Sequence, residues 1–238
     1  MALTTISHRV IDGSRVTIRS ALALDQPFTS LLQLHLGTHL QEFDAGVAGS
    51  ATASARDLGV RSFPHEYRFQ GGRLRFGRTS QYDKTIKLRS SLTVAVWEGK
   101  KFSLFTHAYE AKNHRQLLAV LDQVRIAELT DGLVLTAKRP SQAPVASVTF
   151  VKEVPGLGLL QIQPATREVG KVLPAWQGKR VVGGELFVES DAGAAGGAVH
   201  SFVLAGANAV THVVPDEDDN PERLLPHLAE LHIEWTRA

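Results

Sequence analysis

Apolar and polar residues alternate with a period of two along much of the chain, the pattern of half-buried β-strands. Arg15–Leu24 is the first clear stretch. Leu92–Trp97 and Phe102–Tyr109 form a pair around a Glu-Gly-Lys-Lys turn, and Val145–Val151 and Leu157–Gln163 form a later pair. Short alternating runs separated by turn residues are typical of antiparallel hairpins. The pattern therefore predicts a strand-rich fold built from hairpins.

Helical periodicity is confined to short segments. Asn113–Asp122 predicts an amphipathic helix, with Asn113 as a favourable N-cap. Pro221–Leu231 predicts a second helix near the C-terminus, which Pro226 should kink or shorten because proline lacks a backbone donor. Together with the strands, these segments indicate an α+β fold with antiparallel hairpins and few helices.

The clearest hairpin signal is His65–Phe76. We expect Gly71-Gly72 to form its two-residue turn, because glycine tolerates the positive φ of a type I′ connection. Side chains alternate across a strand, so the hairpin has one basic and one apolar face. The basic face should carry Arg68, Gln70, Arg73 and Arg75, and the apolar face Tyr67, Phe69, Leu74 and Phe76.

The two halves of the chain resemble each other near their ends. Asn113–Ile126 and Asn220–Ile233 match at 5 of 14 positions at an offset of 107 residues. We expect two pseudo-equivalent β-hairpin–helix–strand lobes, residues 1–140 and 145–238, joined by the polar linker Arg139–Pro144. One compact domain is the alternative, since any capped helix that leads into a strand has similar leucine spacing.

Two segments rich in small residues lack core-forming side chains. Ala45–Ala55 and Asp191–Ala198 consist mainly of Ala, Gly and Ser. Such composition is typical of loops. We expect both to be flexible loops that become ordered on contact with a partner.

Composition narrows the classes of function. The chain contains no cysteine, which excludes disulfides, thiol catalysis and Cys-ligated metal centres. No stretch approaches the 18 apolar residues of a membrane-spanning helix, and the first ten residues lack the pattern of a signal peptide. No phosphate-binding glycine loop, dinucleotide fingerprint or nucleophile elbow is present. We therefore expect a cytoplasmic protein without a membrane contact or cofactor, and a binding subunit rather than an enzyme; the catalytic residues stay unknown.

Charge is unevenly distributed along the chain. The net charge is only +2, yet residues 56–115 hold 13 of the 26 Lys and Arg and only 5 of the 24 Asp and Glu. The strongest acidic run is Asp216–Asp219. Such polarity can attract a polyanion or organise self-association, although two solvated surfaces of opposite charge would show the same pattern.

The basic region is the main candidate site. Guanidinium groups bind phosphate oxygens in pairs, so an arginine-rich sheet face can contact a nucleic-acid backbone. Because the aromatic residues fall on the other face, we expect contact with the phosphate backbone rather than recognition of bases. The predicted nucleic-acid-binding residues are Arg68, Arg73, Arg75, Arg78, Lys84, Lys87 and Arg89.

Two alternatives remain. In the first, the protein is a structural or adaptor protein that binds a protein partner or forms a homo-oligomer, with the basic hairpin of one copy against the acidic Asp216–Asp219 of another. In the second, His35 and His39 hold a catalytic metal. The segment His35-Leu-Gly-Thr-His39 resembles the opening of the motif His-x-Gly-Thr-His-x-Asp-x-Pro of the metal-dependent cyclase and formamidase family, which implies a metal-dependent hydrolase. Gln41 and Phe43 replace the Asp and Pro of that motif, so no metal ligand is assigned.

Overall fold

A computed structural model describes residues 3–83, 87–109, 113–192, 198–216 and 221–238. The described strands far outnumber the helices, and their registered pairs are antiparallel, as the sequence predicts. Internal contacts divide the chain into two units. The first unit comprises residues 10–13 and 29–148, and the second comprises residues 1–9, 14–28 and 149–238. Both ends of the chain therefore belong to the second unit.

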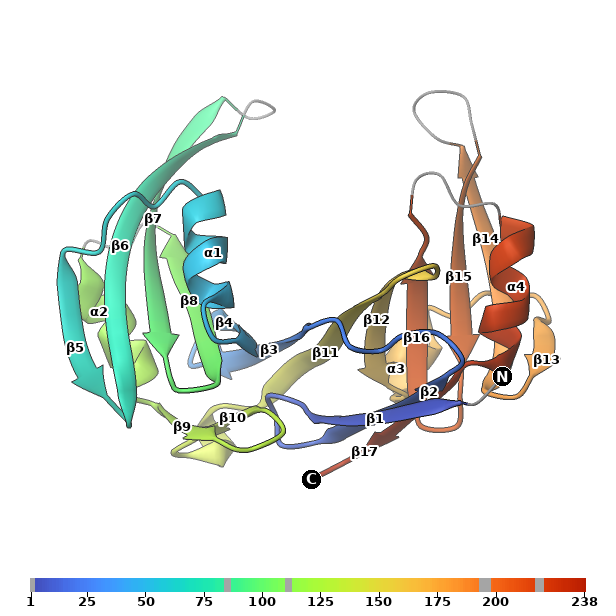
Figure 1. Ribbon diagram of the computed structural model, residues 1–238. Coiled ribbons are helices and arrows are strands. Elements are labelled where there is room, and N and C mark those ends of the chain that lie inside the picture. Colours follow the sequence, from blue (N-terminus) through green and yellow to red (C-terminus); the bar gives the residue numbers. More distant parts are fainter. Residues whose placement is uncertain (1–2, 84–86, 110–112, 193–197, 217–220) are drawn as a thin grey trace. The chain divides into compact units, whose positions relative to one another are not determined.

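The first unit contains a sheet with strand order β5-β6-β7-β8-β4-β3 (Figure 1). Its strands are β3 (Phe28–Leu36), β4 (His39–Val47), β5 (His65–Phe69), β6 (Gly72–Asp83), β7 (Leu88–Glu98) and β8 (Phe102–Tyr109). Its helices are α1 (Ser50–Asp57) and α2 (His114–Leu121), followed by the short 3-10 helix Pro140–Gln142. The hairpin β9 (Val124–Glu128) and β10 (Leu133–Ala137) completes the unit.

The two helices cover opposite faces of this sheet. Helix α1 packs on the face that carries Val94 and Val96 of β7. Helix α2 begins beside Phe76, with the His114 ring 5.4 Å from the Phe76 ring. Val96 lies opposite Arg75, the neighbour of Phe76 on β6, and neighbouring residues of a strand point to opposite faces. The N-cap of α2 is Asn113, as predicted, and its side chain accepts a hydrogen bond from the Arg115 backbone.

Helix α1 corrects the expectation of a flexible loop at Ala45–Ala55. Ala45–Val47 ends β4, and Ser50–Asp57 is helical. The small side chains are the physical reason, because Ala51 and Ala55 lie one helical turn apart and are both buried against β7 and β8. The two buried positions carry small side chains because the helix lies close to the sheet.

The second unit contains a sheet with strand order β13-β14-β15-β16-β12-β11. Its strands are β11 (Val145–Val154, of which residues 149–154 belong to this unit), β12 (Gly158–Pro164), β13 (Lys179–Val181), β14 (Gly184–Ala192), β15 (Ala198–Ala205) and β16 (Ala209–Val214). A separate three-stranded sheet, in the order β1-β2-β17, joins β1 (Thr4–Arg9), β2 (Arg15–Ser20) and β17 (His232–Thr236). The helices of this unit are α3 (Arg167–Gly170) and α4 (Pro221–Glu230).

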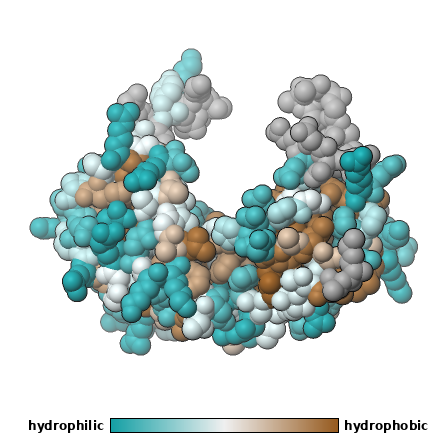
Figure 2. Space-filling view, in the orientation of Figure 1, coloured by the Kyte–Doolittle hydropathy of each residue, from teal (hydrophilic) through white to brown (hydrophobic). Residues whose placement is uncertain are grey.

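The core of the second sheet includes Phe187, Val203 and Val210, with Val169 and Leu173 packed against them. Helix α4 forms where the sequence predicts a helix, and Pro226 lies inside it. The predicted loop at Asp191–Ala198 lies mostly outside the described residues: Asp191 and Ala192 end β14, and Ala198 begins β15. Hydrophilic residues cover much of the visible surface of each unit (Figure 2).

Candidate functional site

The β5–β6 hairpin forms as predicted, but its turn is one residue earlier. Phe69 pairs with Gly72, so the two turn residues are Gln70 and Gly71, with φ angles of 46° and 81°. Tertiary contacts hold Gln70 in this left-handed conformation. Its Nε2 donates to the Val124 carbonyl at 3.0 Å, and its Oε1 accepts from the Ile126 N–H at 2.8 Å. The tip of the hairpin is thereby fixed to β9.

The faces of the hairpin match the prediction, apart from Gln70. Arg68 lies opposite Arg73, and Glu66 lies opposite Arg75, all on one face. Tyr67 lies opposite Leu74 on the other face. Moving the turn by one residue moves each cross-strand partner by two, so that Arg68 faces Arg73 instead of Arg75. A shift of two residues leaves every side chain on the face that alternation assigns to it.

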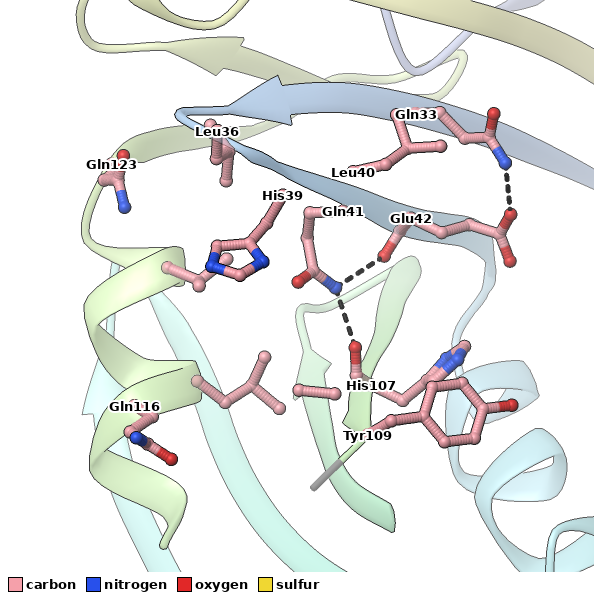
Figure 3. A pocket seen from close by; sticks show the side chains of 13 residues that line it. Gln33, Leu36, His39, Leu40, Gln41, Glu42, His107, Tyr109, Gln116 and Gln123 are labelled. Carbon is pink, nitrogen blue, oxygen red and sulfur yellow. Dashed lines mark hydrogen bonds between the residues drawn. The ribbon is translucent and has the colours of Figure 1, made fainter. Parts of the chain in front are cut away.

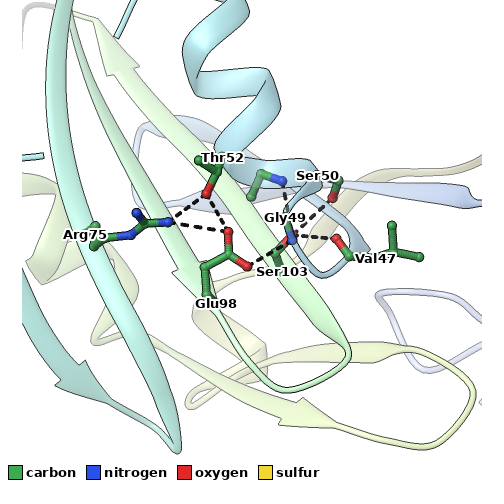
Figure 4. Close-up of polar contacts among 8 residues, drawn as sticks. Val47, Gly49, Ser50, Thr52, Arg75, Glu98 and Ser103 are labelled. Carbon is green, nitrogen blue, oxygen red and sulfur yellow. Dashed lines mark hydrogen bonds and ion pairs between the residues drawn. The ribbon is translucent and has the colours of Figure 1, made fainter. Parts of the chain in front are cut away.

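Arg75 is part of the structure rather than of an open surface. Its guanidinium donates to Thr52 Oγ1 at 2.7 Å and lies 3.6 Å from Glu98 Oε1 (Figure 4). It also stacks over the Phe63 ring. The Thr52 hydroxyl also donates to Glu98, at 2.6 Å. The side chains of Arg75 and Glu98 are only 16% and 13% exposed. This network joins α1 to the sheet.

The structure does not bring the other predicted residues to the same face. Arg78 lies on the face opposite Arg73 and Arg75, where it donates to Ser91 Oγ at 2.9 Å. Lys87 is exposed near the β6–β7 turn with a φ of 51°. Lys84 lies outside the described residues, and for Arg89 only its backbone pairing with Tyr82 is described. Arg75 and Arg78 therefore do not form one open patch with Arg68 and Arg73.

A groove with a volume of about 720 Å³ lies at the tip of the hairpin. Its basic side chains are Arg68, Arg73 and Lys100, and Glu66 and Glu98 also line it. Arg68 and Arg73 are exposed and directly opposite each other. Like charges opposite each other on a sheet destabilise it, and neither guanidinium has an ion pair within the part of the chain that the structure describes. A bound anion would relieve this repulsion.

Lys100 was missed by the sequence analysis, which treated its segment only as a turn. Glu128 fixes the turn by accepting from the backbone N–H groups of Lys100 at 3.1 Å, Lys101 at 2.6 Å and Phe102 at 2.9 Å. Burial raises the pKa of the Glu128 carboxyl, but these backbone donors and the Lys100 charge outweigh burial and lower it below its usual value. The ionised carboxylate thus holds Lys100 at the groove.

A second hollow, of about 620 Å³, opens where β4 and β8 diverge (Figure 3). The two strands pair from Val47 and Phe102 to Phe43 and Thr106. Beyond this point Gln41 bridges the gap, since its Nε2 donates to Thr106 Oγ1 at 2.7 Å and to the His107 carbonyl at 2.8 Å. Glu42 and His107 line the hollow, and Gln33 Nε2 holds Glu42 Oε2 at 2.9 Å.

Titratable groups near this hollow are perturbed by burial. Burial first, and the Glu42 charge second, raise the pKa of Asp44 to about 7. Burial lowers the pKa of His107, although Glu42 opposes that shift. Perturbed groups mark candidate functional sites, but ion-pair networks also produce them. In the described part of the chain, no three His, Asp or Glu side chains are placed to hold a metal ion.

The paired histidines are not metal ligands of one site. Gly37-Thr38 forms the turn between β3 and β4, with Leu36 opposite His39 and His35 opposite Leu40. Because neighbouring residues alternate across a strand, this register places His35 and His39 on opposite faces of the hairpin. The resemblance to the metal-dependent cyclase and formamidase motif is therefore that of a hairpin turn.

No protein-family model, curated protein or solved structure matches the chain. None of the described helices is long and apolar enough to cross a membrane. Function must accordingly be argued from the geometry of the two units.

Proposed function

We propose that the protein is a non-enzymatic binding subunit that contacts the phosphate backbone of a nucleic acid through the groove at the tip of the β5–β6 hairpin. The observation that carries this proposal is the pair of exposed, directly opposed guanidinium groups of Arg68 and Arg73, with Lys100 beside them. Guanidinium forks suit phosphate oxygens, and backbone phosphates supply anions at regular spacing.

The chemistry of the groove favours contact without base recognition. Tyr67 and Phe76 lie on the opposite face of the hairpin, where the Tyr67 ring contacts Phe76 and His114. Tyr67 and Phe69 also line the groove, but the Tyr67 ring packs against Phe76 and His114 rather than beside the arginines, so we expect phosphate contact to dominate over base stacking. We expect weak, salt-dependent binding with little preference for sequence.

The test is fluorescence anisotropy with labelled single-stranded and duplex oligonucleotides at low and moderate salt. The wild type should bind at low salt, with an affinity that falls steeply as salt rises. The double variant Arg73→Glu/Lys100→Glu should weaken binding at least about tenfold and reduce the salt slope by about 2, since each lost phosphate contact contributes about 0.9.

The matched control is Lys179→Glu/Arg180→Glu. It makes the same change in net charge on β13, the outer strand of the other unit, and both residues are exposed. The control should bind like the wild type. Absence of wild-type binding at low salt, or an equal loss in both double variants, would refute the proposal.

We also propose that the two units arose by duplication of one β-rich unit. Their sheets have the same order of elements, and an offset of 107 residues relates the closing pair Glu98–Ser103 to Ala205–Val210. The same offset relates the first residue of α2 to that of α4. An experimental structure in which β3–β9 superposes on β11–β17, element by element, would support this proposal; helices on non-corresponding faces would contradict it.

A further inference from the structure

Strand β5 has one open edge. It pairs with β6, and no other strand of the described chain pairs with it (Figure 1). In a two-residue hairpin the pair that closes the turn is hydrogen-bonded, and bonded and non-bonded pairs then alternate. The closing pair here is Phe69–Gly72, so the main-chain groups of Phe69, Tyr67 and His65 point towards β6. Those of Glu66 and Arg68 point towards the open edge.

This arrangement limits how a second β5 could pair with the first in the antiparallel sense. Hydrogen bonds form only where outward-pointing residues face each other, so Glu66 and Arg68 of one copy must lie opposite Glu66 or Arg68 of the other. Two of the three registers place like charges opposite each other. The third, centred on Tyr67, places Glu66 opposite the partner's Arg68 and Arg68 opposite the partner's Glu66. Only this register is complementary in charge.

The central residue of that register suits a twofold contact. The Tyr67 side chain is 39% exposed, and its hydroxyl lies 2.9 Å from His114 Nε2, which holds the ring in place. In the register centred on Tyr67, the two tyrosines form a non-bonded pair, in which side chains approach most closely. Cross-strand aromatic pairs of this kind stabilise sheets.

We propose that a second copy of the chain binds to this edge, so that two β5 strands pair antiparallel about a twofold axis at Tyr67. The contact is isologous, with about four main-chain hydrogen bonds and two Glu66–Arg68 pairs across it. It differs from the association first expected between the basic hairpin and Asp216–Asp219, because both charges come from β5 itself. It requires no nucleic acid.

Light scattering and sedimentation equilibrium of the full chain, free of nucleic acid and at low salt, test this proposal. The wild type should be a dimer at high concentration and dissociate on dilution, since a five-residue strand forms a small interface. Glu66→Arg places Arg opposite the partner's Arg68, and Arg68→Glu places Glu opposite the partner's Glu66. Each single variant should be a monomer at concentrations where the wild type is dimeric.

A double variant and a mixture of the two single variants show whether dimerisation is lost through mismatched charges or through loss of the fold. The double variant Glu66→Arg/Arg68→Glu restores complementary pairs and should dimerise again. A mixture of the two single variants should form a heterodimer, because one strand then carries two Arg and the other two Glu. Arg180→Glu on β13 is the control and should leave the mass unchanged.

A monomeric wild type at the highest soluble concentration would overturn the proposal, as would single variants that still dimerise or a double variant that stays monomeric. These masses are measured without oligonucleotide, and the nucleic-acid test uses Arg73 and Lys100, which lie off this edge. Failure of one proposal is therefore distinguishable from failure of the other.

Discussion

The outer hairpins of the two units occupy the same place in their sheets but differ in the charges along their edges. Both have a two-residue turn followed by a glycine, Gly72 in β6 and Gly184 in β14. Strand β5 carries an acidic and a basic residue two positions apart. Strand β13 has three residues, Lys179, Arg180 and Val181. If a second β13 paired with it, the positively charged side chains of the two strands would lie side by side. Edge charge of one sign prevents strand pairing, whereas mixed charge in the right order permits it.

The largest expected effect is on stability, when the glycine that follows each hairpin turn is replaced by alanine. A Cβ at Gly184 would collide with the Ala205 carbonyl, and the φ of +138° is itself strained for other residues. At Gly72, whose φ is not in the left-handed region, a Cβ would meet the buried Trp97 ring and lie 2.6 Å from the Glu98 carbonyl. Gly184→Ala should lower the free energy of unfolding by about 4 kcal/mol and Gly72→Ala by about 2 kcal/mol. Urea unfolding measures both, and the reverse order would contradict this account of the hairpins.

The second prediction concerns pH. In the first unit Asp44 on β4 lies opposite Phe105 on β8, and in the second unit Gln161 on β12 lies opposite His212 on β16. The folded-state pKa of Asp44, about 7, exceeds the usual value of 3.8 for an Asp carboxyl. The native state therefore binds the proton more tightly, and its contribution to stability is complete below about pH 4 and is lost as the pH rises to about 7.

Denaturant unfolding at pH 5 and pH 8 measures this effect. The wild type should lose about 4 kcal/mol of stability from this group across the full window, and about 3 kcal/mol of that loss falls between the two pH values. Asp44→Asn should remove this part of the pH dependence, and Asp44→Gln, which also removes the ionisable group, should act similarly. An unchanged pH dependence in both variants would show that Asp44 is not protonated in the native state.

The smallest effect separates the two neighbouring arginines of β6. Arg75→Ala removes the contacts with Thr52 and Glu98 and should cost about 1–2 kcal/mol. Arg73→Ala, at an exposed position, should change stability by less than about 0.5 kcal/mol. In oligonucleotide binding the order should reverse, with the larger loss for Arg73→Ala. Equal effects in both assays would remove the distinction between a structural and a binding arginine.

Local pattern predicted the strands and the faces of the hairpin, because alternation needs only neighbouring residues. It could not place the turn at Gln70, which is held by Val124 and Ile126 more than 50 residues away in sequence. It also missed α1, because the signal for a helix close to a sheet is the absence of large side chains at Ala51 and Ala55. A loop has the same composition.

The candidate site was predicted only in part for a similar reason. Counting basic residues selected Arg75 and Arg78 together with Arg68 and Arg73, yet a distant carboxylate, Glu98, binds Arg75. Lys100 became part of the groove through the β7–β8 turn, which only the tertiary fold brings beside β6. Asp44 and Glu42, two residues apart on one strand, were the signal in the sequence for the perturbed carboxyl.

Hydrogen exchange of the edge amides tests most directly whether β5 is the interacting edge and β13 is not. At concentrations that favour the dimer, the outward-pointing amides of Glu66 and Arg68 should exchange slowly, and dilution should make them exchange fast. The outward-pointing amide of Arg180 on β13 should exchange fast at both concentrations. Fast exchange at both edges under all conditions, or equal protection of both, would contradict the account.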